Sequence, residues 1–517
     1  MSRSRFFYIL GLVLLSGAYL AFSLWLQNRG FYNLESYFMD YKAEILQKFN
    51  TSFLRTFYFT RPALLFILSI PFSLVFEIHG TYILNAILIG ALTNHLLFKS
   101  FTKNSTQKTF VLYLLFSPVI LYAGISGGSL ALYLVFYFLF FQILLKYNDT
   151  KSVFHLTLLG LLLGTHILMD LFYFKLILLI IPVLFIGEFF KAKGINGNLF
   201  YRSSVIFSNP SQRRKFFTGF FASVLIVSFI PGMSYLIFLA INKIFAGDYF
   251  FFEKSIGDSW DSFSSFFPTI DPRDFIWKDI SFSSSKFLIL ALFLSTTTLF
   301  KSLDYSDIQG TKMTLIFTLL FVLAESTSSK IINLNLSHLS ILTGAGLAAF
   351  YTKPLSEKSQ KNQLQLVPFI IPFLAIGMEF LYFKNSLTEN ENLFLQAIEK
   401  PIQADRTKSI EQISLFLSRQ KGGKILSDDA LFYPELTELP EKFTWEGRFS
   451  PFFIYSLQEP KKYPDYVLMT KSTHPLHLND IVATAIKRAV YFESTIETEI
   501  IFENEMVQIL RIKERSL

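Results

Sequence analysis

The sequence predicts a polytopic α-helical membrane protein with about eleven transmembrane helices, followed by a small α+β domain. Three observations support this fold class. Apolar runs follow one another from Phe6 to Phe383, separated by short polar loops that carry Lys and Arg. The composition is 52% hydrophobic, and the mean hydropathy is +0.42. The charge also changes sign: residues 1–384 hold 31 Lys and Arg against 19 Asp and Glu (+12), whereas residues 385–517 hold 16 against 20 (−4).

Each predicted span is an apolar run that approaches the length a bilayer requires. About 20 residues carry a helix across ~30 Å of hydrocarbon, and within lipid a helix satisfies its own backbone. Residues 1–26 are too long for a signal peptide and lack its cleavage pattern, so we expect them to stay as a span. The predicted spans are 6–26, 81–98, 110–123, 129–145, 152–170, 174–190, 216–241, 286–300, 313–325, 337–352 and 364–383.

Segment 62–78 decides the topology, because it is apolar but short and has Pro71 in its middle. If it lies in the outer interface and the N-terminus is cytoplasmic, every Lys/Arg cluster of the loops falls inside. If it crosses with the same N-terminus, those clusters fall outside. A third arrangement, with the N-terminus outside and 27–61 in the cytoplasm, also satisfies the charges. We favour the first, which makes the protein multi-pass in a bacterial inner membrane.

In that topology the outer face carries the loop 27–80, the loop 242–285 and the tail after Lys384. The tail, residues 385–517, is predicted to be an extracytoplasmic α+β domain. We expect helices over 389–400, 408–419 and 478–489, and short buried strands over 424–429 and 465–470. Residues 498–505 and 506–514 alternate in polarity, which predicts a closing hairpin with a turn at Asn504-Glu505.

The composition excludes several kinds of site. The chain has no cysteine and therefore no thiolate ligand or disulfide. Its seven histidines show no metal-ligand spacing, so we expect no metal. The positive charge is spread over loops, so no nucleic-acid partner is expected. The acids Asp258, Asp261, Asp271 and Asp274 of the loop 247–279 do not match a calcium loop, and we interpret them as solvated.

Acids and tyrosines recur in the first outer loop, where LESYFMDYKAEIL contains Glu35, Tyr37 and Asp40. As a helix, 34–49 places apolar side chains on one side and charges on the other. This pattern is typical of an interfacial amphipathic helix whose acids face water. The alternative is that Glu35 or Asp40 points into a cavity and acts as a general base on an acceptor hydroxyl.

The layout of this region resembles a known superfamily. LESYFMDYKAEIL, the Arg61-Pro62 stretch with its following span, SPVILYAGISGGSLALYLVFYFL and SKIINLNLSHLSILTGAGLAAFY are similar to segments of the C-type glycosyltransferases. These integral-membrane enzymes use polyprenyl-phosphate sugars and include protein mannosyltransferases and aminoarabinose transferases of lipid A. The resemblance covers most of the chain as hydropathy and layout.

The chain departs from the family pattern at three places. Leu34 stands where the family has Asp, and the turn 126–129 lacks a second acid. The segment HILMDLFYFK replaces a Lys/Arg-Pro and leaves Asp170 and Lys175 as its charges. These departures are compatible with rebuilt chemistry or with lost catalysis.

The resemblance implies a glycosyltransferase that moves a sugar from a polyprenyl-phosphate carrier to an envelope acceptor at the outer face, with no cofactor. Its partners would be membrane lipids, the lipid-linked sugar donor, and a glycan, lipid or protein acceptor. Because the leaving phosphate needs cations and the acceptor proton needs a carboxylate, we assign roles to residues near that face. The candidate catalytic residues are Glu35 and Asp40. The candidate substrate-binding residues are Tyr37, Arg61, Asp170, Lys175 and His338, with Lys330 as a further cation.

Two other functions remain open at this point. One is a catalytically inactive scaffold of the same fold that binds envelope partners. The other is a lipid or small-molecule transporter, which the scarcity of charges within most spans disfavours.

Overall fold

The computed structural model places most of the chain in two compact units. The helical unit comprises Met1–Trp25, Tyr82–Tyr249 and Phe267–Gln396, and the mixed unit comprises Leu26–Thr81, Phe250–Phe266 and Ala397–Leu517. The structure describes residues 3–48, 53–58, 60–76, 80–100, 113–170, 174–191, 199–254, 314, 316–322, 336–352, 367–384, 386, 389–402, 405–448, 450, 452–460, 462–474, 477, 479–492 and 496–514.

The helical unit is built from long apolar helices. They are α1 (Arg3–Gln27), α5 (Gly80–Ser100), α7 (Pro118–Ile125), α8 (Leu130–Thr150), α9 (Val153–His166), α10 (Phe174–Lys191), α11 (Leu199–Ser208), α12 (Pro210–Ala246), α17 (Leu336–Thr352), α18 (Val367–Lys384) and α19 (Glu389–Glu399). In the described part of the chain, four are long and apolar enough to cross a membrane: Ser4–Gln27, Gly80–Lys99, Leu130–Asn148 and Pro210–Ala246. Their length and composition are consistent with the membrane class predicted from sequence.

The predicted number of spans has only partial support. The four long helices coincide with the predicted spans 6–26, 81–98, 129–145 and 216–241. The spans 152–170, 174–190 and 337–352 correspond to α9, α10 and α17, whose apolar stretches are shorter. The span 364–383 corresponds to α18, and 110–123 to α7 with the turn before it. The span 286–300 and part of 313–325 lie outside the described residues, so about eleven spans remain a prediction.

Small residues let these helices approach closely, as is common between helices in lipid. A Cβ added at Gly90 of α5 would lie 2.3 Å from Ser16 Oγ of α1. One at Gly344 of α17 would lie 2.6 Å from the Tyr137 Cβ of α8. Such contacts leave no room for a larger side chain and fix which helix faces meet.

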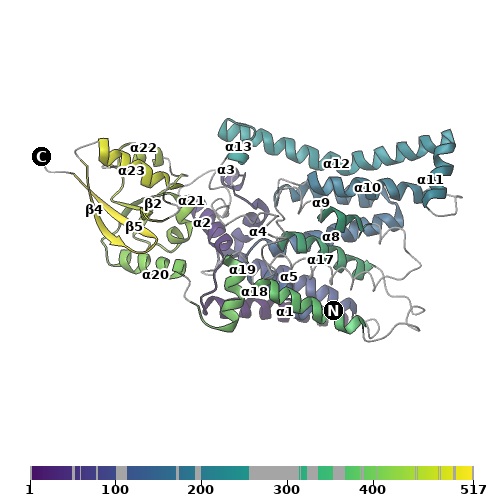
Figure 1. Ribbon diagram of the computed structural model, residues 1–517, viewed down its shortest axis with the longest axis horizontal. Helices are drawn as coiled ribbons and strands as arrows, with labels where there is room; N and C mark the ends of the chain where they lie inside the picture. Colours follow the sequence, from purple (N-terminus) through teal and green to yellow (C-terminus); the bar gives the residue numbers. More distant parts are fainter. Residues whose placement is uncertain are drawn as a thin grey trace, which may run out of the picture. The chain divides into compact units, whose positions relative to one another are not determined.

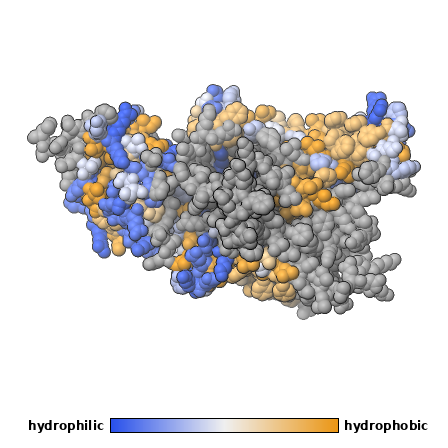
Figure 2. Space-filling view, viewed as in Figure 1, coloured by the Kyte–Doolittle hydropathy of each residue, from blue (hydrophilic) through white to orange (hydrophobic). Residues whose placement is uncertain are grey.

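The surface of the helix α12 indicates which solvent surrounds it. Asn209 Oδ1 accepts a hydrogen bond from the Ser211 N–H (3.0 Å) at its start, and Gly247 ends it with φ +77°. Its 37 residues span about 55 Å. Figure 2 shows apolar side chains along α12 and hydrophilic ones at the end next to α11. An exposed apolar helix of this length fits lipid and not water.

The mixed unit holds a five-stranded sheet of order β2-β1-β3-β5-β4. The strands β1 (Gly423–Ser427), β2 (Phe443–Glu446) and β3 (Tyr466–Thr470) run parallel, with Gly423 opposite Phe443 and Ile425 opposite Tyr466. The hairpin of β4 (Ile496–Glu503) and β5 (Val507–Glu514) adds antiparallel to β3. The predicted turn is confirmed, because Asn504 Oδ1 accepts the Val507 N–H at 2.8 Å.

Helices cover both faces of this sheet (Figure 1). The helices α22 (Phe453–Gln458) and α23 (Ile481–Phe492) bury a core with the sheet. On the other face, α20 (Asp405–Ser418) places the ring centre of Phe416 5.0 Å from the ring centre of Phe502. The predicted tail helices and strands are confirmed, whereas β2, α21 (Asp429–Thr437) and α22 were not predicted. The core residues are Leu426, Phe453, Val467, Met469, Val482, Ala483, Ile486 and Leu510.

The segment predicted to form the first outer loop also belongs to the mixed unit; we call residues 28–79 the arm. It contains α2 (Leu34–Lys48), α3 (Phe53–Tyr58) and α4 (Ala63–Ser73). The 11 residues of α4 span about 16 Å, well short of the ~30 Å of hydrocarbon. The helix α4 is therefore too short to cross the hydrocarbon by itself, and the topology of segment 62–78 stays a prediction.

Candidate functional site

The helix α2 is buried on nearly every side, which corrects the sequence interpretation of solvated acids on an interfacial helix. It packs against α4 and α3 of the arm and against α21 of the tail. Glu35 is 5% exposed and Lys42 is 1% exposed. Amphipathic periodicity alone did not predict this, because the second cover comes from a segment almost 400 residues away in the chain. Glu35 is thus enclosed by protein, whereas Asp40 and Glu44 are half-buried.

Glu35 lies in the first turn of α2, where its position is fixed from two sides. Asn33 caps the helix, and its Oδ1 accepts the Glu35 N–H at 2.9 Å. The next residue, Ser36, shares a hydrogen bond with Thr81 at the start of α5 (2.6 Å between the hydroxyl oxygens). A carboxylate at this end of a helix is favoured by the unpaired N–H groups and the helix dipole. These bonds therefore hold the backbone of the first turn, which carries Glu35.

Asp40 and Tyr37 lie three residues apart and share one face of α2. Ser73 of α4 donates a hydrogen bond to Asp40 Oδ1 at 2.7 Å. Burial, and then the nearby charges of Glu438, Asp40 and Glu435, raise the pKa of the Tyr37 hydroxyl well above its ordinary value. Tyr37 therefore stays protonated at neutral pH.

Lys42 is a buried cation that was not singled out from the sequence. It lies on α2 seven residues after Glu35, and its Nζ lies 4.9 Å from the centre of the Phe38 ring. The available signal was its position four residues after Phe38, which places a charge beside the apolar stripe of α2. A buried charge is tolerated only with pairing or a comparable compensation, so α2 must meet specific polar partners.

Arg61 joins the arm to the short helix α13 (Phe251–Lys254). Its Nη2 donates to the Phe252 carbonyl at 2.6 Å, and the guanidinium lies 5.2 Å from the Phe252 ring centre. Part of the guanidinium is therefore held by protein in the mixed unit.

The other predicted binding residues belong to the helical unit. Asp170 follows α9, and its N–H donates to the His166 carbonyl at 2.8 Å. Lys175 lies in α10 and His338 in α17, but both side chains fall outside the described part of the structure. Lys330 and the acids Asp258, Asp261, Asp271 and Asp274 also fall outside it. The roles assigned to these residues stay predictions.

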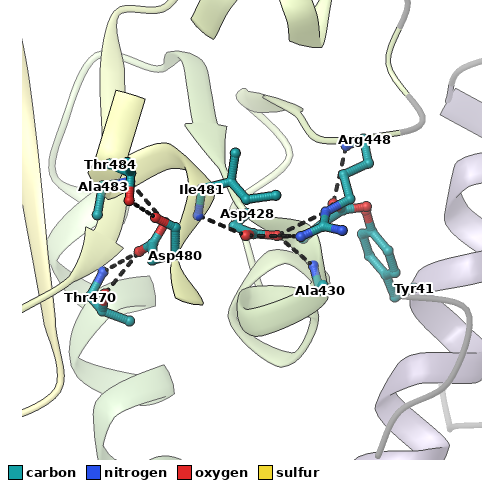
Figure 3. A network of polar contacts seen from close by, with 10 residues as sticks. Tyr41, Asp428, Ala430, Arg448, Thr470, Asp480, Ile481, Ala483 and Thr484 are labelled. Atoms are coloured by element: carbon teal, nitrogen blue, oxygen red, sulfur yellow. Dashed lines mark hydrogen bonds and ion pairs between the residues drawn. The ribbon is translucent and has the colours of Figure 1, made fainter. Parts of the chain in front are cut away.

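A network of polar contacts in the mixed unit lies at the carboxyl ends of its parallel strands (Figure 3). Asp428 directly follows β1, and its Oδ1 caps α21 by accepting the Ala430 N–H (3.3 Å). Arg448, just after β2, places Nη2 2.9 Å from Asp428 Oδ1. Asp480 accepts from the backbone N–H (2.8 Å) and the hydroxyl (2.9 Å) of Thr470, which ends β3.

One contact ties this network to the arm. The Tyr41 hydroxyl of α2 donates to Asp429 Oδ2 at 2.6 Å, while Asp429 Oδ1 accepts the Arg448 N–H at 3.1 Å. Burial raises the pKa of Asp428 to about 6, against the opposing effect of Arg448 and with the added charge of Asp429. Asp428 and Asp429 lie at the end of a strand, as the polar ending of the run 424–429 indicates, but no sequence pattern pointed to Tyr41 as their partner.

The helical unit also contains a buried acid that was not singled out from the sequence. Glu379 of α18 accepts hydrogen bonds from Tyr113 Oη (2.7 Å) and Ser117 Oγ (2.6 Å). Its signal in the sequence was a lone acid within the apolar run 364–383. Ser117 is also the N-cap of α7. Glu379 therefore stabilises a helix start, which accounts for its burial without a ligand.

These observations define the class of the protein. Among the residues that the structure describes, no group of three or more His, Asp or Glu side chains is arranged to hold a metal ion. The chain is a helical membrane protein with a small C-terminal sheet region, in which α21 and Trp445 of β2 contact the arm helix α2. Compared with known proteins, it matches no family model and no curated sequence. A functional assignment must therefore come from the arm itself.

Proposed function

We propose that the protein is a glycosyltransferase that moves a sugar from a polyprenyl-phosphate carrier to an envelope acceptor at the outer face of the inner membrane. The observation that supports this best is the placement of Glu35. It is a buried carboxylate in the capped first turn of α2, in an arm flanked by the two membrane-spanning candidates α1 and α5. A buried carboxylate at an ordered helix start is a suitable group to take the proton of an attacking acceptor hydroxyl.

The reaction needs few groups. The acceptor oxygen bonds to the anomeric carbon of the sugar while the bond from that carbon to the carrier phosphate breaks. The acceptor proton passes to Glu35, with Asp40 as the second candidate, and the electron pair leaves with the polyprenyl phosphate. Cations must offset the charge on that phosphate; Arg61 is the described candidate, and Lys175 and His338 remain expected partners.

The test is transfer by purified protein in lipid nanodiscs. Radiolabelled polyprenyl-phosphate hexoses and pentoses are supplied one at a time with an envelope extract as acceptor. Glu35→Gln keeps the shape of the side chain and removes the base, so we expect transfer to fall by about a hundredfold or more. Glu441→Gln, which changes an exposed acid of the tail, is the matched control. Unchanged transfer by the Glu35 variant would remove this residue from the mechanism.

A catalytically inactive scaffold is the second candidate, and the burial of α2 is compatible with it. Both Asp40 and Tyr41 make hydrogen bonds that join elements of the mixed unit, as structural residues do. The two functions differ in donor binding. A scaffold would show no saturable binding of polyprenyl phosphate in the nanodiscs, whereas the enzyme would bind it and lose affinity on Arg61→Gln.

A further inference from the structure

The carboxyl ends of parallel strands are where open α/β sheets bind their ligands. In this protein the arm helix α2 packs at that edge. It contacts α21, which begins at the end of β1, and places Phe38 5.3 Å from Tyr433 of α21 and Tyr41 5.9 Å from Trp445 of β2 (centre to centre of the rings). The edge is thus filled by a segment of the same chain.

The polar contact at this edge is short, charge-assisted and buried. Tyr41 Oη lies 2.6 Å from Asp429 Oδ2, and the two residues are 1% and 3% exposed. Arg448 holds the acid pair from the other side: its Nη2 lies 2.9 Å from Asp428 Oδ1, and its backbone N–H donates to Asp429. Burial and the Asp429 charge raise the pKa of the Tyr41 hydroxyl and keep it protonated, so it remains the donor.

We infer that Asp429 and Arg448 are positioning residues which, through Tyr41, hold α2 at the carboxyl edge of the sheet and thereby fix Glu35. This rests on the proposed function for the role of Glu35, but not for the holding of α2. In this inference the sheet of the tail supports the arm and is not a second active site.

Other contacts hold the first residues of the arm against the tail. Arg29 Nε donates to the Ala397 carbonyl at 2.6 Å, and the Ile402 N–H donates to the Arg29 carbonyl at 2.8 Å. Gly30 has φ +90°, and a Cβ there would lie 2.0 Å from the Ile402 carbonyl oxygen. The chain is therefore fixed to the tail both before α2 and in its middle.

Hydrogen–deuterium exchange of the full-length protein in nanodiscs tests the inference without any substrate. Tyr41→Phe removes one hydroxyl and keeps the ring beside Trp445, and Asp429→Asn removes the charge. We expect the amides of 34–48 to exchange about tenfold faster, or more, in each variant. The double variant should exchange about as fast as the faster single variant, because both changes act on the same hydrogen bond. Tyr455→Phe, at a tyrosine that is 55% exposed, should leave α2 unchanged.

A second measurement distinguishes loss of the contact between α2 and the tail from general unfolding of the variant. Because the chain has no cysteine, spin labels placed at the exposed positions Gln47 and Glu441 report the distance from α2 to the tail without background. Tyr41→Phe should broaden that distance distribution while the tail amides of 423–427 keep their protection. Unchanged exchange and unchanged distances in both variants would overturn the inference.

Turnover separates this inference from the proposed function. If wild-type protein transfers sugar, Tyr41→Phe should lower kcat and leave the donor KM near its wild-type value. Full turnover despite faster exchange in α2 would overturn the link to Glu35. Absence of transfer by the wild type would remove the proposed function, while the exchange result would still decide whether the tail holds the arm.

Discussion

The helices α12 and α2 reverse the usual relation between polarity and burial. On α12 the apolar Phe221, Leu225 and Phe229 are more than 60% exposed, whereas on α2 the charged Glu35 and Lys42 are almost fully buried. The first pattern is that of a helix in lipid, where exposed hydrocarbon costs nothing. The second is that of a helix whose charges are compensated by neighbouring protein. The comparison shows that the exposure of side chains on α12 is explained by a lipid solvent, whereas the burial of charges on α2 is explained by contacts with other parts of the protein.

The largest expected effect is at the buried cation of α2. Lys42→Ala removes the charge and the aliphatic stem that packs near Phe38, and leaves its surroundings uncompensated. We expect a loss of about 3–5 kcal/mol in the free energy of unfolding, measured by urea titration in detergent with exchange of α2 as the local probe. Lys48→Ala, at the last residue of the same helix, is the comparison variant. A loss below ~1 kcal/mol would mean that Lys42 is solvated.

The matching variant on α12 is Leu225→Arg, because Leu225 is 67% exposed. A charge at the centre of a membrane helix costs about 2.5–3.5 kcal/mol on insertion scales. We expect poor accumulation in the membrane fraction, measured by immunoblot after alkaline extraction, while Leu225→Phe behaves as wild type. Normal insertion of the arginine variant would show that this face of α12 meets water or protein.

The pH dependence of the sheet edge follows from Asp428. Its pKa is about 6 in the folded protein against an ordinary value of 3.8, so the folded state binds the proton more tightly than the unfolded state. The stabilisation that this proton provides is therefore complete below pH ~4 and is lost as the pH rises through ~6, by about 3 kcal/mol in total. Exchange of residues 423–446 should slow as the pH is lowered from 7.5 to 5, after correction for intrinsic rates. Asp428→Asn should abolish that slope, and a wild-type protein without it would contradict the assignment.

The contrast between the two helices also explains what sequence could and could not predict. The apolar run of α12 is a local signal, and so are the alternating residues of β4 and β5 with the turn at Asn504, so all three elements were predicted. The position of α2 depends on Asp429, Arg448 and Trp445, which are distant from Tyr41 in the sequence and approach it only in the folded tail. The strand β2 was missed because four residues carry too little periodicity. The acids of α2 were recognised, but their burial could not be derived from a pattern that ends at residue 49.

The smallest expected effect concerns the first turn of α2 alone. Asn33→Ala removes the oxygen that accepts the Glu35 N–H and should cost about 1 kcal/mol. Asn33→Asp keeps an acceptor at the same place, so it should restore stability. The measurement is exchange of the amides of residues 34–37, which should accelerate in the alanine variant while 41–48 stay protected by Tyr41 and its partners. If the whole helix loosened together, the cap and the tail contact would form one cooperative unit, and the hold on α2 would extend from Asn33 to the sheet.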